Sequence, residues 1–260
     1  MSADQGRFSG KVALVTGASR GIGAEIAKKL AAGGAAFIGV HYANNRDAAL
    51  KVVDEIQALG SKAVALQAEL TDGISAVNKL WASFEEAVRS EVGAVQLDIL
   101  INNAGIAPSS PFEETSLETF EDVINVNVKA PYFLTQLASP HIRDNGRIIN
   151  ISTGFTRVAG PMHTLYSASK GAIETLSLAL APHFASRNIT VNAVRPGTTD
   201  TEMNKDWLVI PEAYAQAASV SAFGRIGTTE EVADVVVFVA SEEARWVTGQ
   251  YIDATGGSQL

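Results

Sequence analysis

The chain has 260 residues, 47% of them hydrophobic and 18% charged, which provides enough apolar side chains for a large core and excludes a disordered protein. Its formal net charge is −8 and it has no basic run, so neither a nucleic acid nor an acidic membrane surface is an expected partner. The chain lacks cysteine, closely spaced histidines, an apolar stretch of bilayer length and an apolar signal core, which together predict a cytoplasmic protein without disulfides or a bound metal.

Short apolar runs recur at regular intervals and have the character of buried parallel strands. These runs are residues 12–16, 36–40, 63–67, 97–101, 147–151 and 189–194. Stretches with helical periodicity lie between them, at residues 23–34, 46–60 and 74–92. This alternation predicts a parallel sheet covered by helices on both faces. Because no repeat, linker or change in composition interrupts residues 1–260, we expect a single α/β domain.

The connection between the first predicted strand and the first predicted helix is rich in glycine. Glycines allow a tight turn and a close ligand approach, and the following helix offers free N–H groups and a positive dipole at its N-terminus. The GxxxGxG spacing differs from the GxGxxG fingerprint, but its place in an α/β pattern favours binding of a dinucleotide pyrophosphate over a packing role alone. The expected contacts from this turn are Gly17, Ser19, Arg20, Gly21, Ile22 and Gly23.

The end of the second predicted strand bears on the choice of cofactor. NAD-binding proteins place a carboxylate there to hold the ribose 2′-OH, whereas this chain has His41 followed by Tyr42. Without a carboxylate to repel it, a 2′-phosphate is admissible, and Arg20 and Arg46 can pair with it. The alternative is that both arginines are only solvated. We therefore predict NADP(H), and NAD(H) is not excluded.

Three later segments carry further candidates. Residues 102–105 follow a predicted strand, where open α/β sheets bind ligands, although two asparagines there can also simply form a turn. Tyr166 and Lys170 are four positions apart and share a helix face, an arrangement that also occurs on solvated helices. Residues 198–227 form a long segment after a strand end, which is typical of a substrate lid.

Five motifs occur in the order that they have in the short-chain dehydrogenase/reductase family, which this chain resembles. Within that family, the motifs are most similar to those of the β-ketoacyl-carrier-protein reductases. The motifs are TGASRGIG at 16–23, NNAG at 102–105, NVNV at 125–128, YSASK at 166–170 and RPG at 195–197. The resemblance covers essentially the whole chain. It implies a Rossmann-type, doubly wound parallel sheet of about seven strands, a nicotinamide cofactor and a homotetramer.

The resemblance also implies a catalytic tetrad. Carried over by position, its tyrosine is Tyr166, its lysine is Lys170 and its asparagine is Asn127. The family's serine falls on Thr153, and the adjacent Ser152 is the rival, because neighbouring side chains of a strand point to opposite faces. The further cofactor contacts that the resemblance implies, besides Tyr166 and Lys170, are Glu69, Leu70, Asn103, Ala104, Gly105, Pro196, Gly197, Thr198 and Thr201.

Reduction of a ketone requires a hydride on carbon and a proton on oxygen. Tyrosine with an ordinary pKa of about 10 is a weak acid, and we expect the nearby Lys170 ammonium to lower the pKa of Tyr166. Thr153 would hydrogen-bond the carbonyl oxygen, and Asn127 would hold a water that links Lys170 to solvent. The expected protein is an NADP(H)-dependent oxidoreductase that reduces a ketone or β-ketoacyl carbonyl to a secondary alcohol.

The substrate stays open between a small-molecule ketone and an acyl thioester carried by a protein. Apolar side chains at 155–163 and in the lid favour the small molecule. A carrier protein would need a basic patch, for which Lys129, Arg143 and Arg147 are scattered candidates. Two further alternatives are a catalytically silent nucleotide-binding regulator, supported only by threonine in the serine position, and an epimerase or dehydratase on the same fold.

Overall fold

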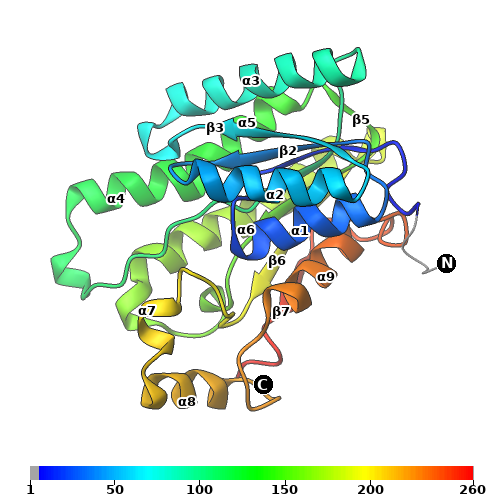
Figure 1. Cartoon of the computed structure of the whole chain (residues 1–260). Helices are drawn as coiled ribbons and strands as arrows, with labels where there is room; N and C mark the ends of the chain where they lie inside the picture. Colours follow the sequence, from blue (N-terminus) through cyan, green and yellow to red (C-terminus); the bar gives the residue numbers. More distant parts are fainter. Residues whose placement is uncertain (1–5, 260) are drawn as a thin grey trace.

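The computed structural model describes residues 6–259 and contains a sheet of seven parallel strands (Figure 1). The strands are β1 (Val12–Val15), β2 (Phe37–Tyr42), β3 (Lys62–Gln67), β4 (Leu97–Asn102), β5 (Ile142–Ile151), β6 (Thr190–Pro196) and β7 (Tyr251–Ala254). Their spatial order is β3-β2-β1-β4-β5-β6-β7, so the winding reverses between β1 and β4. The predicted doubly wound parallel sheet is confirmed, and the reversal marks the edge where such sheets bind ligands.

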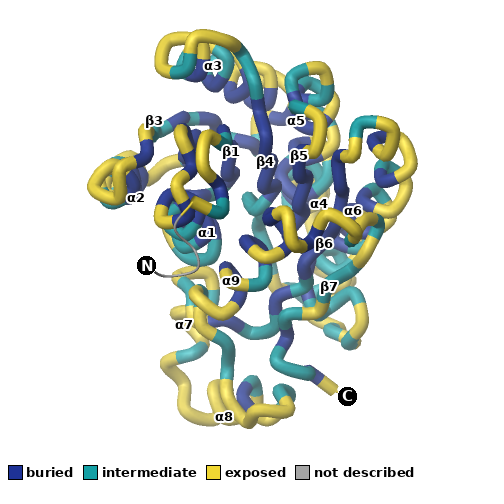
Figure 2. Tube along the Cα trace, turned by 90° about the vertical axis from the view of Figure 1, so that its right-hand side faces the viewer, coloured by how far each residue is buried: buried dark blue, intermediate teal, exposed yellow. Residues whose placement is uncertain are grey.

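Helices cover both faces of the sheet. The α-helices are α1 (Gly21–Ala32), α2 (Arg46–Ala58), α3 (Ile74–Val92), α4 (Leu117–Ile124), α5 (Ala130–Ala138), α6 (Thr164–Phe184), α7 (Lys205–Leu208), α8 (Pro211–Val220) and α9 (Thr229–Ala240). Side chains of α1, α2 and α9 form the core on one face, and those of α3, α5 and α6 form it on the other. Because helices pack on both sides, β1, β2 and β4 are buried at every position, as Figure 2 shows for the central strands.

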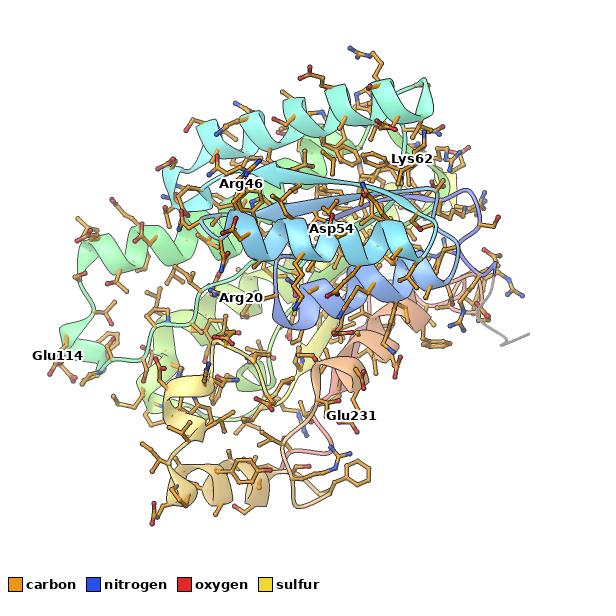
Figure 3. The ribbon with its side chains drawn as sticks, in the orientation of Figure 1. Arg20, Arg46, Asp54, Lys62, Glu114 and Glu231 are labelled. Atoms are coloured by element: carbon orange, nitrogen blue, oxygen red, sulfur yellow. The ribbon has the colours of Figure 1, made fainter. Side chains whose placement is uncertain are left out.

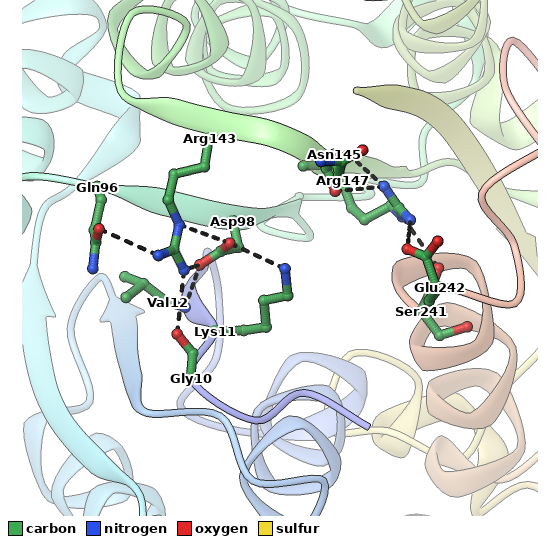
Figure 4. Close-up of polar contacts among 11 residues, drawn as sticks. Gly10, Lys11, Val12, Gln96, Asp98, Arg143, Asn145, Arg147, Ser241 and Glu242 are labelled. Atoms are coloured by element: carbon green, nitrogen blue, oxygen red, sulfur yellow. Dashed lines mark hydrogen bonds and ion pairs between the residues drawn. The ribbon is translucent and has the colours of Figure 1, made fainter. Parts of the chain in front are cut away.

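β5 begins at Ile142 rather than at the expected residue 147. After Ile142 the added residues are polar or glycine, and Asn145 has a φ of 64°, so no apolar alternation marks them in the sequence. They join the sheet because Arg143 pairs with Asp98 of β4, whose carboxylate also accepts a 2.8 Å hydrogen bond from the Val12 N–H of β1 (Figure 4). The buried Asp98 carboxylate thus links three strands at their amino ends, far from the carboxyl edge.

The segment expected to be a lid leaves the sheet and returns to it at one place. Thr199 and Gly227 form an isolated β-bridge, and the Gly227 N–H donates to the Thr198 carbonyl oxygen at 2.9 Å. Between these points lie α7 and α8 with several exposed apolar side chains. Across residues 6–259, none of the helices has the length and apolar character needed to span a membrane.

Candidate active site

The glycine turn packs directly against the segment that follows β4. Gly17 has a φ of 62°, and a Cβ added there would lie 2.9 Å from the Ala104 Cα. A Cβ on Gly23 would lie 2.4 Å from the Gly17 carbonyl oxygen, so both positions require glycine. The Asn103 side-chain amide donates to the carbonyl oxygens of Thr16 and Gly17 at 2.8 and 3.0 Å. Asn103 therefore holds the turn with its side chain.

The N-terminus of α1 is open to an anion. Arg20 precedes the helix without a side-chain cap, and the first turn has no acidic residue. The first N–H groups of the helix have no intrahelical partners, so they and the helix dipole fit a pyrophosphate. Ser19 and Gly21 are partly exposed beside them, while Ile22 packs on the core. The residues present therefore fit a dinucleotide at this turn.

The side chain of His41 is buried beneath the glycine turn rather than exposed at the strand end, and its expected contact with the cofactor stays a prediction. Its side chain is only 2% exposed, and its Nδ1 accepts a 3.0 Å hydrogen bond from the Gly17 N–H. Nε2 therefore carries the proton and donates to the Ala68 carbonyl oxygen at 3.0 Å. Burial lowers the pKa of His41 to about 4, so the ring is neutral at pH 7. Tyr42 is also buried, within the core beneath α1 and α2.

The polar edge beyond Tyr42 suits a 2′-phosphate. Arg20 and Arg46 are exposed at the starts of α1 and α2, and Figure 3 shows both at the end of the sheet from which these helices begin. The nearby carboxylate of Glu69 accepts a 2.9 Å hydrogen bond from Asn44. Two guanidinium groups at this edge match the bidentate acceptors of a phosphate. Leu70, which follows Glu69, is buried in the core of the opposite face.

Tyr166 and Thr153 meet although they come from α6 and the end of β5. The Thr153 hydroxyl lies close enough to the Tyr166 phenol to affect its pKa. Burial raises the pKa of Tyr166, and the neighbouring Thr153 hydroxyl opposes that effect only in part. The expected lowering of this pKa is therefore wrong. The phenol instead keeps its proton at neutral pH, as a proton donor must.

Lys170 is buried behind this pair. Its Nζ lies 5.9 Å from the centre of the Tyr166 ring and donates a 2.8 Å hydrogen bond to the Ile151 carbonyl oxygen. Burial lowers the pKa of Lys170 to about 8, so the amine is mostly charged at pH 7. A cation thus lies near the phenol without touching its oxygen.

Ser152 and Thr153 follow directly after β5, and their hydroxyls have different partners on α6. The Ser152 hydroxyl donates to Glu174 Oε1 at 2.7 Å, whereas the Thr153 hydroxyl meets Tyr166. Of the two candidates, only Thr153 lies beside the phenol. The choice between them depended on which side chain of α6 each hydroxyl reaches, Glu174 for Ser152 and Tyr166 for Thr153.

Asn127 lies in a π-helical turn (Asn125–Lys129) between α4 and α5, a kind of turn that is frequent at functional sites. Its side-chain amide donates to the Ile106 carbonyl oxygen and to Ser169 Oγ, and its Oδ1 accepts from the Ile106 N–H. A Cβ on Gly105 would lie 3.1 Å from Lys170 Nζ and 3.4 Å from Asn127 Oδ1, so both groups border Gly105. The water link between them stays a prediction.

The end of β6 completes the carboxyl edge. Pro196 is buried, and a Cβ on Gly197 would lie 2.8 Å from the Thr255 carbonyl oxygen, so the chain passes β7 closely. The Thr201 methyl group would lie 3.7 Å from a Cβ on Gly21. Thr198 and Thr201 therefore start the lid beside the glycine turn, and the structure brings the predicted cofactor segments to one edge.

Glu174 belongs to this region and was missed by sequence reasoning. It is a carboxylate that is only 5% exposed and accepts hydrogen bonds from Ser152, Thr156 and Arg195. The available signal was its place as the lone acid of its helix, four positions after Lys170. Among residues 6–259, no cluster of three His, Asp or Glu side chains is placed to hold a metal ion.

Known proteins resemble this chain along nearly its whole length. Residues 17–259 match the family described as enoyl-(acyl carrier protein) reductase. The structure of the angucycline C-6 ketoreductase LanV with bound NADP has a TM-score of 0.93, 45% identity, and 97% of each chain covered. Versicolorin reductase stcU of Emericella nidulans is 41% identical over 268 residues, covering 99% of this chain and 98% of its own. Hydroxynaphthalene reductase arp2 of Aspergillus fumigatus is 39% identical over 255 residues, covering 94% and 90%.

The chain therefore belongs to the short-chain dehydrogenase/reductase family, and the resemblance noted from its motifs is confirmed. Its class is that of the NADP(H)-dependent ketoreductases, as predicted.

Proposed function

We propose that this protein uses NADPH to reduce a ketone on a planar, fused-ring aromatic molecule to a secondary alcohol. The observation that carries the proposal is an aromatic wall beside the proton donor. Phe155 stacks on His163 with ring centres 4.7 Å apart and an interplanar angle of 13°, and it meets Tyr166 edge-on at 6.5 Å. Flat rings of this kind favour a flat, apolar ligand. The relative named a hydroxynaphthalene reductase supports the same substrate class.

The wall adds no charge at neutral pH. Burial lowers the pKa of His163 below its ordinary value of 6.5, so the imidazole is mostly uncharged. A neutral aromatic ketone therefore suits the wall better than an acidic substrate. The exposed lid side chains Met203, Trp207 and Tyr214 supply apolar surface that can cover such a ligand from the other side.

Each member of the tetrad has a distinct part in this function. Tyr166 gives its phenolic proton to the carbonyl oxygen, and Thr153 hydrogen-bonds the same oxygen as negative charge develops on it. Bound NADPH supplies the hydride. The charged Lys170 stabilises the phenolate that remains after the proton transfer. Asn127 fixes the backbone of Ile106 through two hydrogen bonds.

A carrier-protein substrate is supported less well. Arg143 and Arg147 lie towards the amino ends of the strands, opposite Thr153, and both are engaged in ion pairs (Figure 4). Lys129 donates a 2.8 Å hydrogen bond to Asn125 Oδ1. These cations do not gather around the carboxyl edge, so they offer no single surface to an acidic partner.

A substrate screen tests the proposal. Oxidation of NADPH is followed with a bicyclic aromatic ketone such as a tetralone, with an aliphatic ketone, and with an acetoacetyl thioester. We expect the bicyclic ketone to have a kcat/KM roughly 10- to 100-fold above the others, the range that a hydrophobic pocket provides. A preference for the thioester would instead indicate an acyl reductase. NADPH binding without turnover of any carbonyl would indicate the silent regulator.

We further propose a homotetramer, which the exposed apolar side chains support. Leu117 of α4 is 72% exposed, Tyr132 of α5 is 47% exposed, and Trp246, before β7, is 96% exposed. Apolar surface of this size is typical of faces that pack against another chain. Light scattering after size exclusion should give a tetramer mass, and Trp246→Glu should reduce it. A monomeric wild-type protein would contradict the proposal.

A further inference from the structure

Glu174 carries a buried carboxylate one helical turn beyond Lys170. Its Oε1 accepts hydrogen bonds of 2.7 Å from both Ser152 Oγ and Thr156 Oγ1. Arg195 of β6 binds both carboxylate oxygens, with Nε to Oε1 at 2.6 Å and Nη2 to Oε2 at 2.7 Å. The carboxylate thus joins α6 to the end of β5, to the short helix η4 (Gly154–Thr156) and to the end of β6.

The Glu174 carboxylate keeps its charge in this setting. Burial raises the pKa of Glu174, but the hydrogen bonds from Arg195, Ser152 and Thr156 together outweigh burial and hold the pKa below its ordinary value. The hydrogen bond to Glu174 in turn raises the pKa of Arg195. A buried pair with this many satisfied hydrogen bonds is stable as a unit, and removal of one partner leaves the other charge uncompensated.

The groups that Glu174 holds lie on both sides of Thr153. Ser152 precedes it, and the Thr156 hydroxyl contacts both Glu174 and the Thr153 carbonyl oxygen, the latter at 2.9 Å. The backbone of Thr153 is thereby fixed from α6, the helix that also carries Tyr166. Because Thr153 is β-branched, a fixed backbone leaves its hydroxyl few directions.

We propose that Glu174 is a positioning residue for the ketone reduction: it fixes the end of β5 so that the Thr153 hydroxyl meets the Tyr166 phenol. This inference rests on the proposed roles of Thr153 and Tyr166. Glu174 is buried among Ser152, Thr156 and Arg195, and it acts through Ser152 and Thr156.

Glu174→Gln tests the proposal, because glutamine keeps the size but turns an NH2 group towards hydrogen-bond donors and leaves Arg195 unpaired. We expect kcat for the ketone to fall about tenfold or more, with the KM for NADPH nearly unchanged. The alkaline limb of the kcat/KM profile should move to higher pH, because the Thr153 hydrogen bond lowers the pKa of Tyr166.

Asp98→Asn is the matched control, because it removes another buried carboxylate that pairs with an arginine, at the opposite end of the sheet. This variant should lose thermal stability with no change in kcat. If Glu174→Gln does not fold, Thr156→Val leaves the ion pair intact and should show the same pH shift with a smaller loss of kcat. An equal loss of kcat in the Asp98 and Glu174 variants would overturn the proposal.

A double-mutant cycle separates positioning from general destabilisation. In a Thr153→Ala background, Glu174→Gln should reduce kcat less than about twofold further, because the hydroxyl that it positions is gone. Independent, multiplying losses would assign Glu174 a structural role only. A Thr153→Ala variant as active as the wild type would instead refute the proposed role of Thr153, so the two failures are distinguishable.

Discussion

His41→Asn tests how the protein supports its glycine turn. The imidazole is buried between the Gly17 N–H and the Ala68 carbonyl oxygen and must stay neutral to accept the first of these hydrogen bonds. Asparagine also carries an acceptor and a donor, but it does not titrate. The substitution therefore removes the dependence of stability on the protonation of residue 41.

The size of the effect follows from the pKa of His41, which burial lowers from 6.5 to about 4. The unfolded chain therefore binds the proton first as the pH falls. The stability linked to His41 is fully present above pH 6.5 and is lost as the pH falls towards 4, to a total of about 3 kcal/mol. Between pH 7.5 and 5.5 the loss should be about 1.3 kcal/mol.

Urea unfolding of the wild type and His41→Asn at pH 7.5 and 5.5, without NADPH, measures this loss. All other groups titrate alike in the two proteins. The difference in the free energy of unfolding between the wild type and His41→Asn should therefore be about 1.3 kcal/mol smaller at pH 5.5 than at pH 7.5. His183→Asn, at an exposed position, serves as the control for loss of a histidine. A difference that is the same at both pH values would refute the buried, neutral state of His41.

Three further sets of substitutions address the cofactor and the chemistry. Tyr166→Phe should lower kcat by about 10²- to 10⁴-fold while NADPH still binds, as measured by its fluorescence; retained turnover would exclude the phenol as proton donor. Thr153→Ala should lower kcat by about 100-fold and Ser152→Ala much less, and the reverse order would move the role by one residue. Arg20→Ala and Arg46→Ala should raise the KM for NADPH by up to about tenfold and leave that for NADH unchanged; an unaltered preference would contradict the 2′-phosphate contacts.

Much of the fold was predictable because its signals are local. Apolar runs between glycine and asparagine placed most strands within a few residues, and the spacing of Gly17, Gly21 and Gly23 marked the first turn. The early start of β5 was not predictable, because the residues after Ile142 are polar or glycine and Arg143 pairs there with Asp98 of another strand. A strand that depends on a partner distant in sequence leaves no periodic pattern of its own.

The sequence alone determined the family and the order of most elements, and it singled out Tyr166, Lys170 and the glycine turn as candidates, because motif spacing and periodicity are properties of neighbouring residues. Only the tertiary structure decided that Thr153 rather than Ser152 meets the phenol, that burial raises the pKa of Tyr166, and that His41 supports the turn from beneath. Those properties depend on which atoms other elements bring against each side chain, since burial and hydrogen bonds set both its direction and its charge.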